Sequence, residues 1–180
     1  MPDWGWFAIV VGAAAGILAV VWIGRQVWVS RARRQAVALY GRAQGVAQAI
    51  RSLDEIMTRL AESDDATLAA FLNDAESDDR RALIELGHRM GIIADDVEHT
   101  ALPKMLWGTA DELESIARRL SEEAGRVGDA DTPEAVLDAV QHIGLRDIEA
   151  RFEHTASELD AQMRSLGVKE ASVYGGGLYI

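Results

Sequence analysis

Residues 29–60 read VSRARRQAVALYGRAQGVAQAIRSLDEIMTRL and carry a regular hydrophobic repeat. Apolar or small residues recur at alternating intervals of three and four positions, the spacing that places side chains along one stripe of a helix. The sequence therefore predicts one long amphipathic helix. Its second half is the stronger coiled-coil seam, because the stripe residues there are larger. The predicted seam residues of that half are Val46, Ile50, Leu53, Met57 and Leu60.

Two further stretches nearer the C-terminus repeat the same spacing. One runs from Leu106 to Val127, and the other runs from Leu145 to Met163. No stretch of the sequence shows the alternation of apolar and polar residues that is typical of a β-strand. Long amphipathic helices bury their apolar stripes against one another, so the expected fold class is all-α, with a helical bundle or coiled-coil domain.

Local start and stop signals divide the rest of the chain into helices. Gly91 and Gly167 follow apolar periodic stretches, and we expect each of them to end a helix. The glycine-rich stretch 125–133 reads as a loop. Serine or threonine followed by acidic residues or proline marks a helix N-terminus. The expected N-cap residues are Ser63, Ser77 and Thr132.

The net charge of −11 is unevenly distributed along the chain. Residues 1–53 contain six arginines and one aspartate, a net charge of +5, which leaves −16 for residues 54–180. Contacts to phosphates need clustered cations, so we do not expect the acidic part to bind nucleic acid. The chain contains no cysteine, which excludes disulfides and thiolate metal sites.

The stretch from Trp4 to Ile23 contains no charged residue. As a helix its 20 residues are about 30 Å long, which matches the hydrocarbon core of a bilayer, and tryptophans stand near both ends. A cleaved signal peptide would begin with a basic region, whereas this chain begins Met-Pro-Asp. We therefore expect a single N-terminal transmembrane helix that remains as an uncleaved signal anchor.

Positive charge follows this predicted anchor. Because cytoplasmic flanks of membrane spans are enriched in arginine and lysine, we expect the N-terminus outside the cell inner membrane and the C-terminus in the cytoplasm. The same cations suit anionic lipid headgroups, although fixing the orientation of the span is the simpler role. The residues expected to contact headgroups are Arg25, Arg31, Arg33 and Arg34.

These features divide the chain into segments. The last segment has three consecutive glycines followed by Leu178, Tyr179 and Ile180, which are poor choices for a solvated end. We expect it to dock on its own domain or stay disordered in preference to capturing a partner. The expected segments are a transmembrane anchor at 1–24, a basic juxtamembrane heptad helix at 25–62, an acidic helical bundle at 63–167 and an apolar, glycine-rich tail at 168–180.

Two features of the sequence predict self-association. Gly12 and Gly16 form a G-x-x-x-G motif, which lets two membrane helices approach closely. The seam that continues from it can pack inside its own bundle or against a second chain, and both arrangements satisfy the pattern. We favour a parallel homodimer, because anchored chains already meet at high effective concentration.

The sequence offers little sign of catalytic chemistry. It lacks the H-E-x-x-H, G-x-S-x-G, G-x-x-x-x-G-K-[ST] and strand-linked G-x-G-x-x-G motifs. Asp96 and His99 form only a single D-x-x-H unit, and His154 with Glu158 reads as a pair within one helix. We therefore expect no enzyme activity, no metal and no cofactor. The acid pairs at 64–65, 78–79 and 95–96 are expected at helix starts, where negative charge suits the macrodipole.

Three functional hypotheses follow from these patterns. The first is a membrane-anchored, non-enzymatic interaction protein, a scaffold or regulator that self-associates and presents its acidic bundle to a cytoplasmic protein partner. The second is a membrane-active protein, such as a phage-type holin or exclusion factor, that acts by oligomerising in the bilayer. In outline the chain resembles single-span holins with a cytoplasmic coiled coil. The third is a membrane-tethered enzyme without a recognisable signature.

Overall fold

The computed structural model describes residues 4–73 and 77–168, and it describes side chains from Leu18 onward. These ranges contain helices and no strand, so the all-α prediction is confirmed. The helices are α1 (Trp4–Ala61), α2 (Asp65–Asn73), α3 (Asp78–Glu98), the short 3-10 helix η1 (Lys104–Leu106), α4 (Trp107–Gly128), α5 (Pro133–His142) and α6 (Leu145–Ser165).

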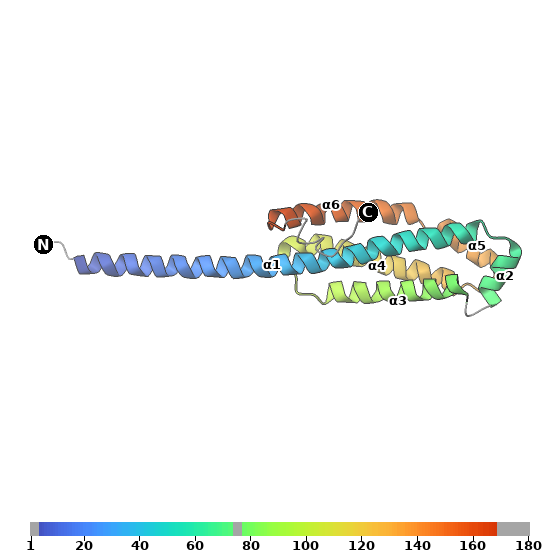
Figure 1. Ribbon diagram of the computed structural model, residues 1–180, viewed down its shortest axis with the longest axis horizontal. Helices are drawn as coiled ribbons and strands as arrows, with labels where there is room; N and C mark the ends of the chain where they lie inside the picture. Colours follow the sequence, from blue (N-terminus) through green and yellow to red (C-terminus); the bar gives the residue numbers. More distant parts are fainter. Residues whose placement is uncertain (1–3, 74–76, 169–180) are drawn as a thin grey trace.

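The long helix α1 is unbroken over 58 residues, a length of about 87 Å. Among the described side chains, the first buried one belongs to Ala32. The helix before that point projects beyond the other helices (Figure 1). The boundary predicted near residue 24 therefore does not interrupt the helix.

The remaining part of α1 is one element of an up-and-down bundle. Helices α1 and α4 run in one direction, while α3 and the consecutive helices α5 and α6 run in the other (Figure 1). Helix α2 crosses the bundle at one end, which we call the far end. The opposite end, where α1 leaves the bundle, is formed by residues 99–107 and 163–168, and we call it the base.

The predicted seam of α1 lies inside this bundle. None of its five residues is more than 5% exposed. Ala49 and Ile56 on the same helix are also buried, so the apolar stripe is wider than the narrow seam of a two-stranded coiled coil. Of the two arrangements that satisfied the sequence pattern, the structure shows the one in which the seam packs within its own chain.

Helices α3 and α4 are closely packed because small residues line their contact. The Ser121 hydroxyl of α4 donates a hydrogen bond of 2.8 Å to the carbonyl oxygen of Gly87 in α3. Gly91 lies one turn further along α3 and also faces Ser121. The prediction that Gly91 ends this helix is wrong, because α3 continues to Glu98 and the glycine serves close packing within it.

The helix N-termini are capped partly as expected. The Thr132 hydroxyl accepts a hydrogen bond of 3.1 Å from the Ala135 amide at the start of α5, as predicted. At the start of α2 the capping side chain belongs to Asp64 instead of Ser63, and it accepts from the Thr67 amide at 2.9 Å. Ser77 occupies the N-cap position of α3 without a capping hydrogen bond from its side chain.

The helix C-termini agree with one prediction and differ from another. Gly167 adopts a φ of 70°, which favours glycine, and α6 ends just before it, as predicted. The expected loop at 125–133 is shorter, because α4 continues through Gly128, which packs against Leu83 and Ile84 of α3. Gly144, with a φ of 58°, separates α5 from α6.

No helix among the residues searched, those whose side chains are described, is long and apolar enough to cross a membrane. This finding does not support the transmembrane anchor predicted from Trp4 to Ile23. Residues 4–17 of that stretch, which include Gly12 and Gly16, lie outside the described side chains.

Candidate functional site

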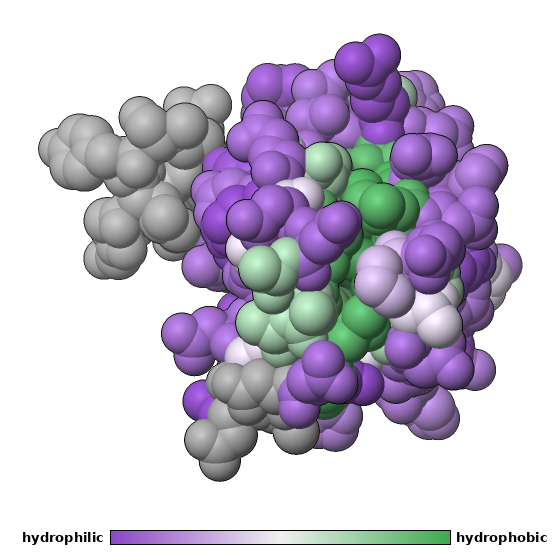
Figure 2. Space-filling view, turned by 90° about the vertical axis from the view of Figure 1, so that its right-hand side faces the viewer, coloured by the Kyte–Doolittle hydropathy of each residue, from purple (hydrophilic) through white to green (hydrophobic). Residues whose placement is uncertain are grey.

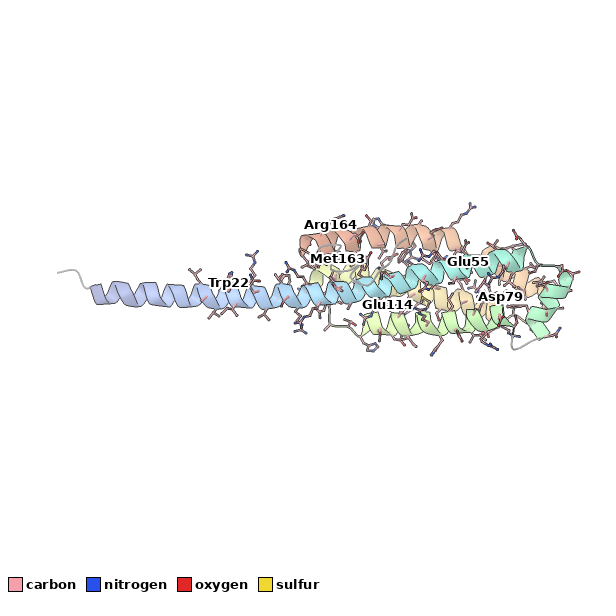
Figure 3. The ribbon with its side chains drawn as sticks, viewed as in Figure 1. Trp22, Glu55, Asp79, Glu114, Met163 and Arg164 are labelled. Atoms are coloured by element: carbon pink, nitrogen blue, oxygen red, sulfur yellow. The ribbon has the colours of Figure 1, made fainter. Side chains whose placement is uncertain are left out.

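The part of α1 that projects from the bundle exposes an unusual amount of apolar surface. Trp22 lies on this projecting part, well beyond the other helices (Figure 3). Large apolar side chains between residues 18 and 28 are 54% to 70% exposed. They are Leu18, Val20, Val21, Trp22, Ile23, Val27 and Trp28.

These side chains surround the helix instead of forming one stripe. Each residue of an α-helix is turned by about 100° from the one before it, so the consecutive residues 20 to 23 already point in nearly all directions. A helix that is apolar on all sides is typical of a membrane span or of the centre of a large core. Exposing such residues to water costs about 1.5–3 kcal/mol each, so a stable state covers them.

Exposed arginines mark the point where α1 enters the bundle. The Arg33 guanidinium donates to the carbonyl oxygen of Leu166 and so links α1 to the end of α6. Arg25, Arg31 and Arg34 are exposed and form no ion pair with the described residues. Arg33 therefore has a structural contact at the base, while the other three present free guanidinium groups to whatever adjoins this end of the bundle.

The loop between α3 and α4 adds two residues to the base that the sequence analysis did not single out. Lys104 places its Nζ atom 5.9 Å from the centre of the Trp107 ring. Trp107 is 51% exposed, and its indole N–H donates to the carbonyl oxygen of Leu102 at 2.9 Å. A signal was present in the sequence, because Lys104 is one of two lysines in the chain and residues 99–110 contain no acid.

Charge is separated along the axis of the bundle. Three segments at the base, residues 26–37, 99–110 and 161–168, contain no acidic residue. The far end carries the acidic starts of α2 and α3, and its surface is mainly hydrophilic around a central apolar strip (Figure 2). The base is therefore the basic end of the molecule, and the far end is acidic.

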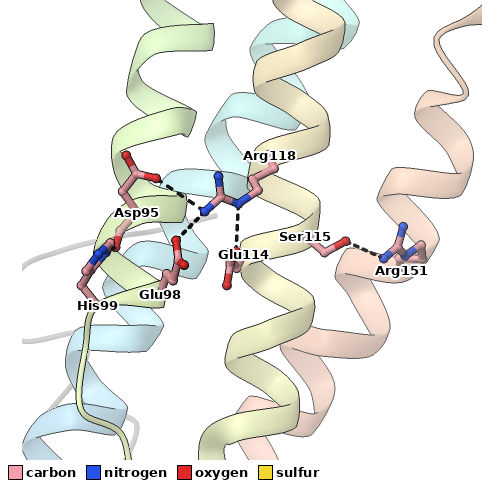
Figure 4. Close-up of polar contacts among 7 residues, drawn as sticks. All are labelled: Asp95, Glu98, His99, Glu114, Ser115, Arg118 and Arg151. Carbon is pink, nitrogen blue, oxygen red and sulfur yellow. Dashed lines mark hydrogen bonds and ion pairs between the residues drawn. The ribbon is translucent and has the colours of Figure 1, made fainter.

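The acidic residues at the end of α3 belong to an ion-pair cluster. Arg118 of α4 lies 2.6 Å from Glu98, 2.8 Å from Glu114 and 3.5 Å from Asp95 (Figure 4). The hydrogen bond to Glu114 and the three nearby carboxylates raise the pKa of Arg118. The cluster joins the exposed sides of α3 and α4.

The expectation that residues 95–96 begin a helix is wrong, because they lie in the last turn of α3. Cations on neighbouring helices offset their charge there. Arg118 pairs with Asp95, and Arg42 of α1 lies 3.7 Å from Asp96. The other two acid pairs do lie at helix starts, as predicted.

The histidines are exposed and separated from one another. His154 pairs with Glu158 at 3.4 Å within α6, which confirms the predicted pair. His99 contacts the carbonyl oxygen of Asp95 at 2.8 Å. Within the part of the chain that the structure describes, no group of three or more histidines and acids is arranged to hold a metal ion.

No family model, curated protein or solved structure matches this chain. The geometry defines only a class, an all-α bundle with one helix that extends far beyond it. Functional inference therefore depends on two features. One is the apolar surface of the projecting helix, and the other is the basic, tryptophan-containing base beside it.

Proposed function

We propose that the chain is a single-pass, non-enzymatic interaction protein, a scaffold or regulator, anchored in the cell inner membrane with its bundle in the cytoplasm. The observation that carries the proposal is the projecting end of α1, which exposes large apolar side chains on every side. A bilayer covers such a helix completely, whereas a single groove on a partner covers one face.

The composition of the base supports the same placement. Tryptophan rings prefer the headgroup level of a bilayer, and Trp28 and Trp107 are both exposed at this end. Lys104 and the free arginines add cations beside them, each worth about 1 kcal/mol near an anionic surface. The acidic far end then points away from the membrane and is the surface available to a cytoplasmic protein partner.

Self-association remains part of the proposal, but the proposed contact between the two chains moves from the α1 seam to the membrane span. Because the five seam residues between Val46 and Leu60 are buried in their own bundle, they are not available to a second chain. We therefore assign self-association to the membrane-embedded part of α1, where Gly12 and Gly16 allow close approach.

Membrane fractionation tests the anchor. The double substitution Val20→Asp and Val21→Asp adds two charges to the proposed span, at a cost of about 2.5–3.5 kcal/mol each near its centre and less toward its end. The matched control places aspartates at Ile84 and Ile92, which are exposed apolar residues on the bundle. We expect the unmodified chain and the control to stay in membranes washed with alkaline carbonate, and the first variant to be released. Release of the unmodified chain would contradict the proposal.

The membrane-active alternative uses the same projecting helix, and one measurement separates it from the scaffold. A scaffold leaves the bilayer sealed, whereas a lesion-forming protein collapses the membrane potential when its expression is induced. We expect the membrane potential to persist in cells that contain the full chain in their membranes. Rapid loss of the potential would favour the holin-like function.

A further inference from the structure

A groove of about 550 Å³ runs along one side of α1. Helix α1 supplies its floor, and residues of the two helices that lie on either side of α1 complete the lining (Figure 1). Phe152 and Ala156 belong to α6, and Arg89 belongs to α3. Most of the described lining residues are apolar or small, so the groove suits an apolar surface.

Two glycines one helical turn apart keep the floor of the groove low. A Cβ atom at Gly41 would have no neighbour within 4 Å, so the absent side chain leaves open space. A Cβ atom at Gly45 would lie 3.1 Å from the Ile93 side chain, so glycine there lets α3 approach α1. A backbone from another molecule can therefore come close to α1 at Gly41.

The end of the groove nearer the far end of the bundle is cationic. Arg51 of α1 and Arg89 of α3 are exposed there, and neither forms an ion pair with a described residue. The described residues that line the groove include no acid. Elsewhere on the bundle Arg42 and Arg118 each pair with acids of a neighbouring helix. Two unpaired cations beside an apolar floor favour a ligand that is apolar and acidic.

The position and shape of the groove argue against three other occupants. It begins at Tyr40, about 24 Å along the helix from Gly24, so headgroups beside the predicted anchor do not reach it. Two copies anchored in one membrane stand at the same height, and a two-fold contact between their grooves would set arginines against arginines. A small ligand would keep much of its surface in water, because Gly41, Gln48 and Arg51 lie exposed.

We infer that this groove is the docking site for an acidic amphipathic helix of a cytoplasmic partner. From Tyr40 to Arg51 the floor rises about 17 Å, the length of about three helical turns. The apolar stripe of the partner helix packs against the floor and Phe152, and its acidic residues reach Arg51 and Arg89. The inference rests on the proposed role as an interaction protein, and it gives that role a second surface, opposite in charge to the far end.

Selection from a random library of displayed peptides tests the inference, with the full chain held in nanodiscs. The test variant is Gly41→Trp, which fills the groove from its floor without meeting a neighbour at Cβ. The matched control is Gly125→Trp on α4, because Gly125 also has no neighbour within 4 Å and does not line the groove. The peptides collected are those that bind the unmodified chain and the control but not the Gly41→Trp variant.

We expect the collected peptides to repeat apolar residues at spacings of three and four, and to contain more Asp and Glu than Lys and Arg. For such a peptide, Arg51→Glu combined with Arg89→Glu should weaken binding by about tenfold, and lysine in place of its acids should restore binding. This restoration would also show that the substituted chain remains folded.

A selection that yields no peptide sensitive to Gly41→Trp, or one that yields mainly basic peptides, would overturn the inference. Loss of self-association in the Gly41→Trp variant would also overturn it, because a second copy would then occupy the groove. Failure of the anchor would appear separately, as chain that stays outside the nanodiscs, and the selection can be repeated on that material.

Discussion

At the scale of single residues, Asp64 makes the stability of the first turn of α2 depend on pH. Its carboxylate accepts hydrogen bonds from the Thr67 side chain and backbone, and the side-chain bond is the largest cause of its lowered pKa. A carboxyl group with a lowered pKa stabilises the folded state above its ordinary pKa, about 3.9. That contribution disappears as the pH falls through the lowered value.

We therefore expect Asp64→Ala to speed amide hydrogen exchange in α2 at neutral pH, because the helix loses its capping acceptor. Asp64→Asn keeps a side-chain oxygen and serves as the control. At pH 7 the amides of α2 should stay protected in this variant. Below about pH 4 the unmodified chain should lose protection as Asp64 is protonated, whereas the Asn variant should not show this additional loss. Identical acid sensitivity in the unmodified chain and the Asn variant would contradict this account of the cap.

The sequence predicts contacts within one helical turn better than contacts that depend on how the helices pack. The contact of Arg33 with lipid headgroups stays a prediction, and the structure adds a hydrogen bond from its guanidinium to Leu166 at the end of α6, between residues 133 positions apart. Lys104 and Trp107 were missed because their place at the base depends on how the helices pack. The predicted pair of His154 and Glu158 was confirmed because both residues belong to one helical turn.

At the scale of helices, close contact between α3 and α4 depends on glycine. A Cβ atom at Gly87 would lie 3.4 Å from the Ser121 carbonyl oxygen, whereas one at Gly125 would have no neighbour within 4 Å. Gly87→Leu should therefore lower the free energy of unfolding by about 1–3 kcal/mol through overpacking. Gly125→Leu should leave it unchanged or raise it by about 0.5–1 kcal/mol, because leucine favours helix. Thermal unfolding followed by circular dichroism compares the two, and equal destabilisation would contradict the packing.

The seam of α1 gives a second prediction at this scale. Leu53 is fully buried in its own bundle, so Leu53→Ala should cost about 2–5 kcal/mol of stability at every protein concentration. The exposed neighbour Asp54 provides the control, and Asp54→Ala should change stability by less than about 0.5 kcal/mol. A loss that appears only at high protein concentration would show that the seam joins two chains.

Helix patterns explain how far the fold could be predicted. The period of apolar residues identified α1, α4 and α6, because that signal is local. It could not decide whether the α1 seam faces its own bundle or a second chain, because both arrangements bury the same side chains. Gly91 was misread for a related reason, since the glycine serves contact with α4 and not a change in backbone direction.

At the scale of the whole molecule, the single helix α1 connects the proposed membrane span to the core of the bundle. The projecting part of α1 exposes large apolar side chains on all sides between Leu18 and Ile23, and the same helix continues without a break into the bundle core. Because the connection is a continuous helix, the bundle has a defined direction relative to the proposed membrane span. The basic base lies next to that span, and the acidic far end lies away from it.

The most direct test of this account measures where single cysteines can be labelled by a membrane-impermeant maleimide. Ala19→Cys places the thiol in the projecting helix, and Asp129→Cys places it at the far end of the bundle. Because the chain has no other cysteine, each label reports one position. We expect Asp129→Cys to react in inverted inner-membrane vesicles but not in intact spheroplasts, and Ala19→Cys to react in neither until detergent is added. Labelling of Ala19→Cys in sealed membranes, or recovery of the chain outside the membrane fraction, would contradict the membrane anchor.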